Sequence, residues 1–212
     1  MPKRIHIMSF VGLTIVAWLV ALWAQGIPVL TTDFLKPFSI VVGVIGAVAT
    51  IFNKWAWSWA VFRGWYINRP DIRGTWKVIL HSNWTDPKTS KGVPPICAYM
   101  AVKQSLTTLS LRLMTPESHS RLIAHSIDIE NDEIFRLAAV YRNEPKLSLQ
   151  GDRSEIHHGS MVLEIYGTPP ISMEGNYWTD RATRGTMKLI EQKNEVFDTF
   201  EDANSAFTTI SS

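Results

Sequence analysis

The sequence predicts a membrane-anchored, mainly β protein with two N-terminal transmembrane helices, an eight-stranded antiparallel up-and-down β-barrel and a short C-terminal helix. Three observations lead to this prediction. Two long apolar runs lie within residues 1–63, the hydrophobic pattern changes to a period of two from Gly74 onward, and turn residues divide the second part into eight short segments. With 46% apolar and 19% charged residues, the 212-residue chain is not a disordered protein.

The N-terminal part of the chain is predicted to form the membrane anchor. The run from Ile5 to Trp23 has no formal charge, and as a helix it is long enough to cross a hydrocarbon core of roughly 30 Å. A second apolar run extends from Phe38 to Lys54. After it, Trp55, Trp59 and Phe62 have helical spacing on one face, which is typical of an aromatic belt at a membrane surface.

The distribution of lysine and arginine predicts how this anchor is oriented. Lys3 and Arg4 precede the first run, a group of basic residues that begins with Lys54 follows the second, and the connecting loop contains only Lys36. Because positively charged flanks stay on the cytoplasmic side, we expect a multi-pass membrane protein with both termini in the cytoplasm. The alternative for the first run is a signal peptide that is cleaved near Ala24.

Small residues line one face of the second apolar run. They are Ser39, Gly43, Gly46, Ala47 and Thr50. Small side chains let transmembrane backbones approach closely, and this close packing drives helix association in lipid. Two interpretations remain open: a seam against the first helix of the same chain, or a self-association face between subunits of a homo-oligomer.

Residues 64–212 are predicted to form the barrel domain. The eight expected strands are Gly74–Ser82, Ile96–Gln104, Thr107–Leu113, His119–Ile129, Ile134–Arg142, His158–Tyr166, Ser172–Thr179 and Arg184–Glu191. Closing such strands into a barrel removes exposed sheet edges. The inward positions are expected to be Trp76, Leu80, Met100, Leu109, Leu111, Phe135, Leu137, Leu163 and Met187. Val196–Phe207 has apolar residues at helical spacing and is expected to pack on the barrel as a helix.

In an up-and-down barrel, the loops that follow odd-numbered strands gather at one end, which we call the far mouth. Arginines near these strand ends suit phosphate, because the guanidinium group makes bidentate contacts. Aromatic side chains could stack on bases, each contact contributing about 1–3 kcal/mol. At the other end, the acidic turn Asp128–Glu133 would repel an anion. The predicted ligand-binding residues are Arg112, Arg121, Tyr141, Arg142, Tyr177, Trp178, Arg181 and Arg184, with Tyr99 as a further stacking candidate.

Three sequence segments together resemble a known family. They are Asn68-x-Pro70-Asp71-x-x-Gly74-Thr75-Trp76-Lys77, Gly175-Asn176-Tyr177-Trp178-Thr179-Asp180-Arg181-x-Thr183-x-Gly185-x-Met187, and Phe200-Glu201-Asp202-Ala203. In this order after two apolar runs, they resemble the two-transmembrane β-barrel effector of CBASS, the bacterial cyclic-oligonucleotide anti-phage signalling systems.

The resemblance implies a cytoplasmic barrel at the bacterial inner membrane that binds a cyclic dinucleotide made by a partner synthase. It further implies that the ligand drives homo-oligomerisation, disruption of the lipid bilayer, and growth arrest or cell death. Gly74-Thr75-Trp76 also resembles the opening of lipocalins. The alternative function is therefore a membrane-tethered, lipocalin-like binder of an apolar small molecule.

Other chemistry has little support in the sequence. No nucleophile has a partnered base, and the single Cys97 excludes both a disulfide framework and a cysteine-cluster zinc site. His157 and His158 are adjacent and do not share a strand face, so we expect no metal site. The basic isoelectric point comes from the apolar N-terminus, which argues against direct DNA or RNA binding. We expect no catalytic residues, no enzymatic activity and no cofactor.

Overall fold

The computed structural model describes residues 4–29, 31–85, 90–129, 134–149 and 155–208. The chain divides into two compact units. The first comprises Met1–Asn68 and Ser105–Thr107, and the second comprises Arg69–Gln104 and Thr108–Ser212.

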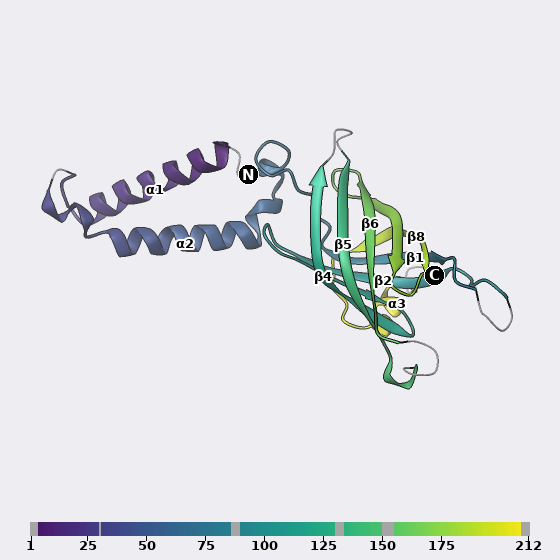
Figure 1. Cartoon of the computed structure of the whole chain (residues 1–212). Helices are drawn as coiled ribbons and strands as arrows, with labels where there is room; N and C mark the ends of the chain where they lie inside the picture. The colour runs from purple at the N-terminus through teal and green to yellow at the C-terminus, as the bar shows by residue number, and fades with distance from the viewer. Residues whose placement is uncertain (1–3, 30, 86–89, 130–133, 150–154, 209–212) are drawn as a thin grey trace. The chain divides into compact units, whose positions relative to one another are not determined.

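Two apolar helices dominate the first unit. They are α1 (Arg4–Ala24) and α2 (Phe38–Lys54), with a 3-10 turn at Thr32–Leu35 between them. The segments Ile5–Ala24 and Thr32–Lys54 have mean hydropathies of 2.2 and 2.0, and by length and composition both could cross a membrane. The helices lie side by side as a hairpin (Figure 1).

The small-residue face of α2 is exposed in the single chain. Ser39, Gly43, Gly46, Ala47 and Thr50 are all solvent-accessible, and a Cβ atom added at Gly43 or Gly46 would meet no atom within 4 Å. The interpretation of this face as a seam against α1 is therefore wrong. Self-association through these residues stays a prediction.

The aromatic segment after α2 is not a continuation of the helix, so the predicted common face of Trp55, Trp59 and Phe62 is wrong. Helix α2 ends at Lys54, and the chain continues as two 3-10 turns, Ala56–Ser58 and Ala60–Phe62. The backbone leaves the helical region at Trp55, where φ is −130°, and becomes extended at Trp59, where ψ is 142°. Trp55 and Trp59 nevertheless remain more than half exposed.

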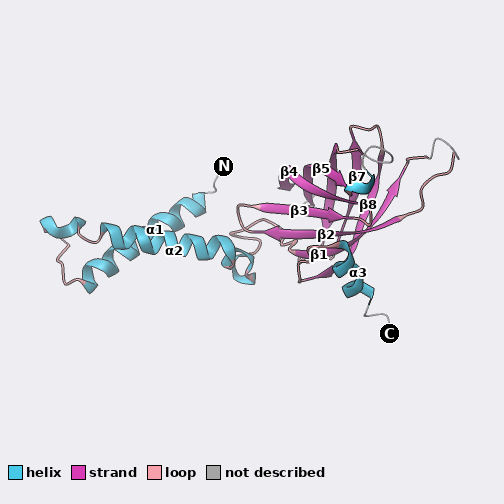
Figure 2. Ribbon diagram, turned by 90° about the horizontal axis from the view of Figure 1, so that it is seen from below, coloured by secondary structure: helices cyan, strands magenta, loops and turns pink. Residues whose placement is uncertain are grey.

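The second unit is a closed barrel in which each strand pairs antiparallel with its neighbours in sequence and the eighth strand pairs with the first. Its strands are β1 (Gly74–Ser82), β2 (Ile96–Gln104), β3 (Leu109–Met114), β4 (Ser118–Ile129), β5 (Phe135–Pro145), β6 (His157–Tyr166), β7 (Ser172–Thr179) and β8 (Arg184–Lys193). The sequence prediction of an eight-stranded up-and-down barrel is confirmed (Figure 2). The predicted acidic turn at 128–133 lies largely outside the described residues.

The barrel interior is filled by apolar side chains. All the residues predicted to face inward belong to this core, eight of them buried and Phe135 partly buried against them. One void between these side chains has a volume of about 20 Å³ and is lined by Met100, Met161 and their neighbours. A void of this size holds about one water molecule and is too small for a lipid-like ligand.

One end of the barrel is closed by the segment that leads into β1. The side chain of Gln104 accepts a hydrogen bond from the backbone N–H of Ile72 (3.0 Å) and donates one to the carbonyl oxygen of Pro70 (3.0 Å). The indole of the fully buried Trp76 donates to the carbonyl oxygen of Ile72 (2.9 Å). These bonds hold the lead-in segment against the base of the core, so the open end is the far mouth.

Helix α3 (Phe200–Thr208) packs on the outer face of the barrel, beside β2 (Figure 2). Phe207 and Ala203 are buried against Tyr99, whose hydroxyl donates to Asn204 Oδ1 (3.0 Å). The helix begins four residues after the predicted start because Thr199 caps it. Thr199 Oγ1 accepts from the N–H of Asp202 (3.1 Å), which fixes the first turn there.

Candidate functional site at the barrel mouth

The connections β1–β2, β3–β4, β5–β6 and β7–β8 meet at the far mouth, where the described residues line a cavity of about 430 Å³. This volume is in the range of small-molecule sites. The lining residues are Leu80, Ser82, Trp84, Val93, Ile96, Leu113, Thr115, Pro116, Glu117, Ser118, Ser120, Tyr141, Asn143, Pro145, His157, Tyr177, Thr179, Arg181, Thr183 and Met187.

Two tyrosines form the aromatic walls of the mouth, and each lies over a glycine on the neighbouring strand. Tyr141 on β5 is paired with Gly159 on β6, and Tyr177 on β7 is paired with Gly185 on β8. A Cβ atom at Gly159 would overlap the Tyr141 ring, and one at Gly185 would lie 2.8 Å from Tyr177 Cε1. The two glycines therefore make room for the rings and hold them against the inner wall.

The electrostatics of the mouth keep Tyr141 uncharged. Burial, and then the neighbouring Tyr177 and Asp180, raise the pKa of Tyr141 well above the usual value of about 10. A neutral phenol can both donate and accept a hydrogen bond. Tyr141 can thus offer a stacking face and a polar group to the same ligand.

Next to Tyr141, on the side of the open end, lies a buried polar pair. Ser120 Oγ on β4 donates a hydrogen bond to Asn143 Oδ1 on β5 (2.8 Å), and these two residues are direct partners in the strand register. Their exposed fractions are 6% and 8%. Because β5 runs toward the far mouth, Asn143 lies two residues nearer the open end than Tyr141, so the polar pair belongs to the wall of the mouth, and apolar residues such as Leu113 and Met187 line the void beneath it.

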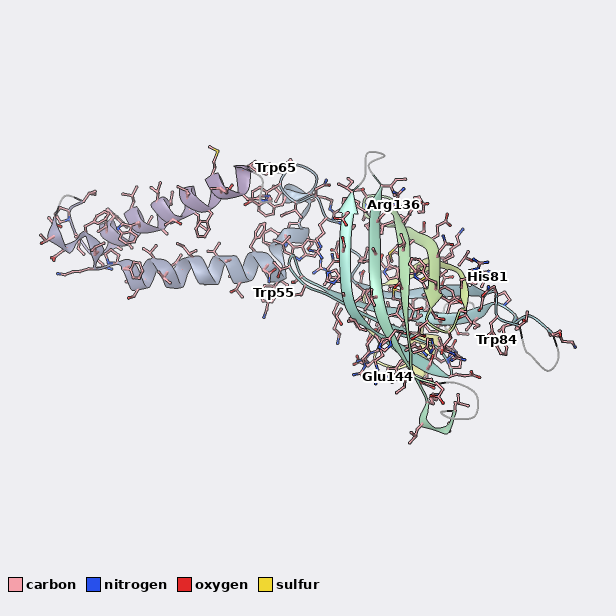
Figure 3. All side chains as sticks on the ribbon, in the orientation of Figure 1. Trp55, Trp65, His81, Trp84, Arg136 and Glu144 are labelled. Atoms are coloured by element: carbon pink, nitrogen blue, oxygen red, sulfur yellow. The ribbon has the colours of Figure 1, made fainter. Side chains whose placement is uncertain are left out.

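The rim of the mouth carries few charges. Arg181, in the β7–β8 turn, is the only lysine or arginine among the described lining residues, and Glu117 is the only acid. The turn is stabilised by a hydrogen bond of 2.7 Å between the hydroxyls of Thr179 and Thr183. Close to this turn, the β1–β2 connection begins with Asn83, whose side-chain oxygen accepts from the N–H of Arg184 (2.9 Å). The next residue, Trp84 (Figure 3), is 39% exposed.

The structure brings three of the sequence-predicted ligand-binding residues together in the mouth: Tyr141, Tyr177 and Arg181. It does not bring the others there. Arg112, Arg121 and Arg142 occupy matching positions on the outer faces of β3, β4 and β5. Trp178 and Arg184 are partners on the outer face of β7 and β8.

The physical reason is the period of two along a strand, because each of these residues is next to one that points inward. Arg142, for example, lies between the inward Tyr141 and Asn143, and its Nε is 3.3 Å from Glu144 Oε1. Arg112 donates to the carbonyl oxygen of Asp198 (3.2 Å). Whether the outer-face residues contact a ligand stays a prediction. The further candidate Tyr99 is buried under α3 and is not available for stacking.

Sequence reasoning missed Ser120, Asn143 and Trp84. A signal for Asn143 was present: if Tyr141 points inward, the residue two positions later does so as well. Ser120 follows in the same way, because it is the register partner of Asn143. Polar residues near strand ends do not stand out as lining residues, because most residues of their kind are exposed.

A closed barrel with a filled interior and one open, aromatic and polar mouth is the architecture of a small-molecule receptor rather than of a carrier that encloses its ligand. Residues 67–191 match the family described as Cap15, cyclic dinucleotide receptor domain, and this match covers more than half of the chain. The chain belongs to this receptor family of CBASS effectors, which confirms the resemblance drawn from the sequence. No curated protein matches the chain.

Proposed function

We propose that this protein is an anti-phage effector that binds a cyclic dinucleotide in the mouth of its barrel and responds by self-association and disruption of the inner membrane. The supporting observation is a coincidence of two findings. The match to the cyclic dinucleotide receptor domain spans residues 67–191, and every described residue that lines the mouth cavity lies within that range.

The chemistry of the mouth suits such a ligand. Tyr141, Tyr177 and Trp84 offer aromatic faces for two bases, and stacking contributes about 1–3 kcal/mol for each base. Arg181 supplies a guanidinium group for phosphate. The hydroxyl groups of Ser118, Thr179 and their neighbours supply hydrogen bonds without adding charge. Binding alone is sufficient for this role, so no catalytic group is required.

The membrane part of the proposal rests on α1 and α2. In the proposed arrangement both helices cross the inner membrane, both termini lie in the cytoplasm, and the barrel meets the ligand on the side where a partner synthase would make it. Assembly then uses the exposed small-residue face of α2, because small side chains allow close approach between helices of different subunits.

Titration of the full-length protein in detergent micelles tests the ligand site. Arg181→Ala removes the one lysine or arginine of the described mouth lining. Because a hydrogen bond to a charged group contributes about 1.5–3 kcal/mol, we expect the affinity for a cyclic dinucleotide to fall roughly 10-fold to 100-fold.

Lys188→Ala is the matched control, since Lys188 lies on the outer face of β8 and pairs with Glu174 (3.4 Å). We expect its affinity to equal that of the unaltered protein. Equal affinities for the Arg181 and Lys188 variants would place the phosphate contacts elsewhere. The same titration with Arg112→Ala and Arg142→Ala would then decide whether the outer face contributes.

A further inference from the structure

The Ser120–Asn143 pair in the wall of the mouth has one hydrogen-bonding group without a partner among the described residues. Ser120 Oγ donates to the carbonyl oxygen of the Asn143 side chain. The other end of the Asn143 side chain is an amide nitrogen with two donor hydrogens. No described residue accepts a hydrogen bond from it. The residue is only 8% exposed, yet this nitrogen is not one of the fully enclosed, unpartnered polar atoms among the described side chains, so it can be reached from the mouth.

The position of this nitrogen decides what can reach it. Asn143 lines the mouth cavity, so a ligand in the mouth can accept a hydrogen bond from this nitrogen. Tyr141 and Asn143 are successive inward residues on β5, about 7 Å apart along the strand. A base stacked on the Tyr141 ring can therefore direct its polar edge toward Asn143.

We infer that Asn143 reads one base of the ligand and selects a base with a carbonyl group on that edge. The inference rests on the function proposed above. At the corresponding exocyclic position, the carbonyl oxygen of uracil (O4) or guanine (O6) accepts the amide N–H, whereas the amino group of cytosine (N4) or adenine (N6) would place a donor against a donor. Ser120 acts as a positioning residue, because its hydrogen bond to Oδ1 keeps the nitrogen directed into the mouth.

The test uses full-length protein in detergent and four probes: cyclic di-UMP and cyclic di-GMP as carbonyl ligands, and cyclic di-AMP and cyclic di-CMP as amino ligands. The quantity measured is the ratio of affinities between the best carbonyl and the best amino ligand. For the unaltered protein we expect this ratio to be at least tenfold. Asn143→Asp replaces the donor with an acceptor and should lower the ratio at least tenfold, while Asn143→Leu should bring it near one.

Three further variants distinguish a loss of base selection from a loss of folding. Ser120→Ala frees the Asn143 amide to rotate, so the ratio should fall toward one, and Ser120→Thr should restore it because the hydroxyl returns. Asn176→Asp makes the same chemical change on the outer face of β7, where Asn176 is exposed, and should leave the ratio unchanged. If the Asn143 variants do not fold, the two Ser120 variants decide whether the amide selects the base.

The outcomes distinguish this inference from the proposed function. If the unaltered protein binds none of the four probes or other cyclic dinucleotides, the proposed function fails and the inference fails with it. If it binds them without base preference, or if the folded Asn143 and Ser120 variants keep the preference, the inference is overturned and the receptor function stands.

Discussion

At the scale of single residues, burial controls the charge state of the tyrosines in the barrel. Burial is the first cause that raises the pKa of Tyr141 at the mouth, and it also raises that of Tyr99 under α3, followed there by the hydrogen bond with Cys97. A tyrosine whose pKa is higher in the folded state contributes stability below its unfolded pKa of about 10. This contribution is lost as the pH rises from there toward the folded pKa.

Tyr141→Phe is therefore expected to change how stability depends on alkaline pH. Between about pH 10 and 12, the unfolded chain of the unaltered protein gains a phenolate at position 141 that the folded barrel resists, so its stability falls. The Phe variant lacks this phenolate and should lose stability less steeply. Thermal unfolding of the full-length protein in detergent across this pH range measures the difference, and parallel curves would contradict it.

At the scale of elements, the start of β1 depends on a backbone conformation that favours glycine. Gly74 has φ of +111°, and a Cβ atom there would overlap the carbonyl oxygen of Lys193. Side chains other than glycine rarely adopt this region, and forcing one into it costs about 1–3 kcal/mol before the overlap is counted. Gly74 is thus required where β1 meets the end of β8 and the barrel closes.

Gly74→Ala should lower the free energy of unfolding of the barrel by about 3 kcal/mol, because strain and steric overlap act together. Denaturant titration followed by tryptophan fluorescence measures this loss, since Trp76 is buried two residues away. Gly92→Ala is the control: its φ is ordinary and an added Cβ would meet nothing within 4 Å. Similar losses in both variants would show that the conformation at Gly74 is not the cause.

The elements themselves were largely predictable from the sequence, and the mouth was predictable only in part. Alternation such as Trp76, Val78 and Leu80 indicates both a strand and its inward face, and the structure confirms it in the buried core. The segment after Trp55 was not predictable, because its tryptophans fit helical spacing as well as they fit the 3-10 turns that form.

The mouth shows why strand ends are harder to predict than strand centres. Position along the strand indicates which end of the barrel a residue reaches, and this position alone predicts that the arginines at the strand ends lie near the mouth. Whether a side chain points into or out of the barrel, however, changes from each residue to the next along the strand. Arg142 therefore lies on the outside, while its neighbours Tyr141 and Asn143 line the cavity. In the sequence, their charge makes these arginines candidates for ligand binding. In the structure, the alternation of inward and outward positions along each strand decides which residues line the mouth.

At the scale of the whole molecule, the proposed response requires a surface that the single chain does not use. With 100° of rotation per residue, Gly43 and Ala47 lie on the opposite side of α2 from Val41, the buried residue of that helix. The small-residue face is therefore accessible to a second subunit without any rearrangement of α2. Ligand recognition and assembly are assigned to separate residues and can be altered separately.

Gly43→Leu combined with Ala47→Leu should abolish growth arrest in cells that also express a cyclic dinucleotide synthase. The larger side chains keep neighbouring subunits from close approach, but the space around an added Cβ atom at Gly43 is empty in the chain's own fold, so ligand affinity in detergent should not change. Val44→Leu is the control, because Val44 is exposed about a third of a turn away from this face. If the double variant arrests growth as strongly as the Val44 variant, assembly does not proceed through α2, and the membrane damage must arise from another surface even though the barrel still binds its ligand.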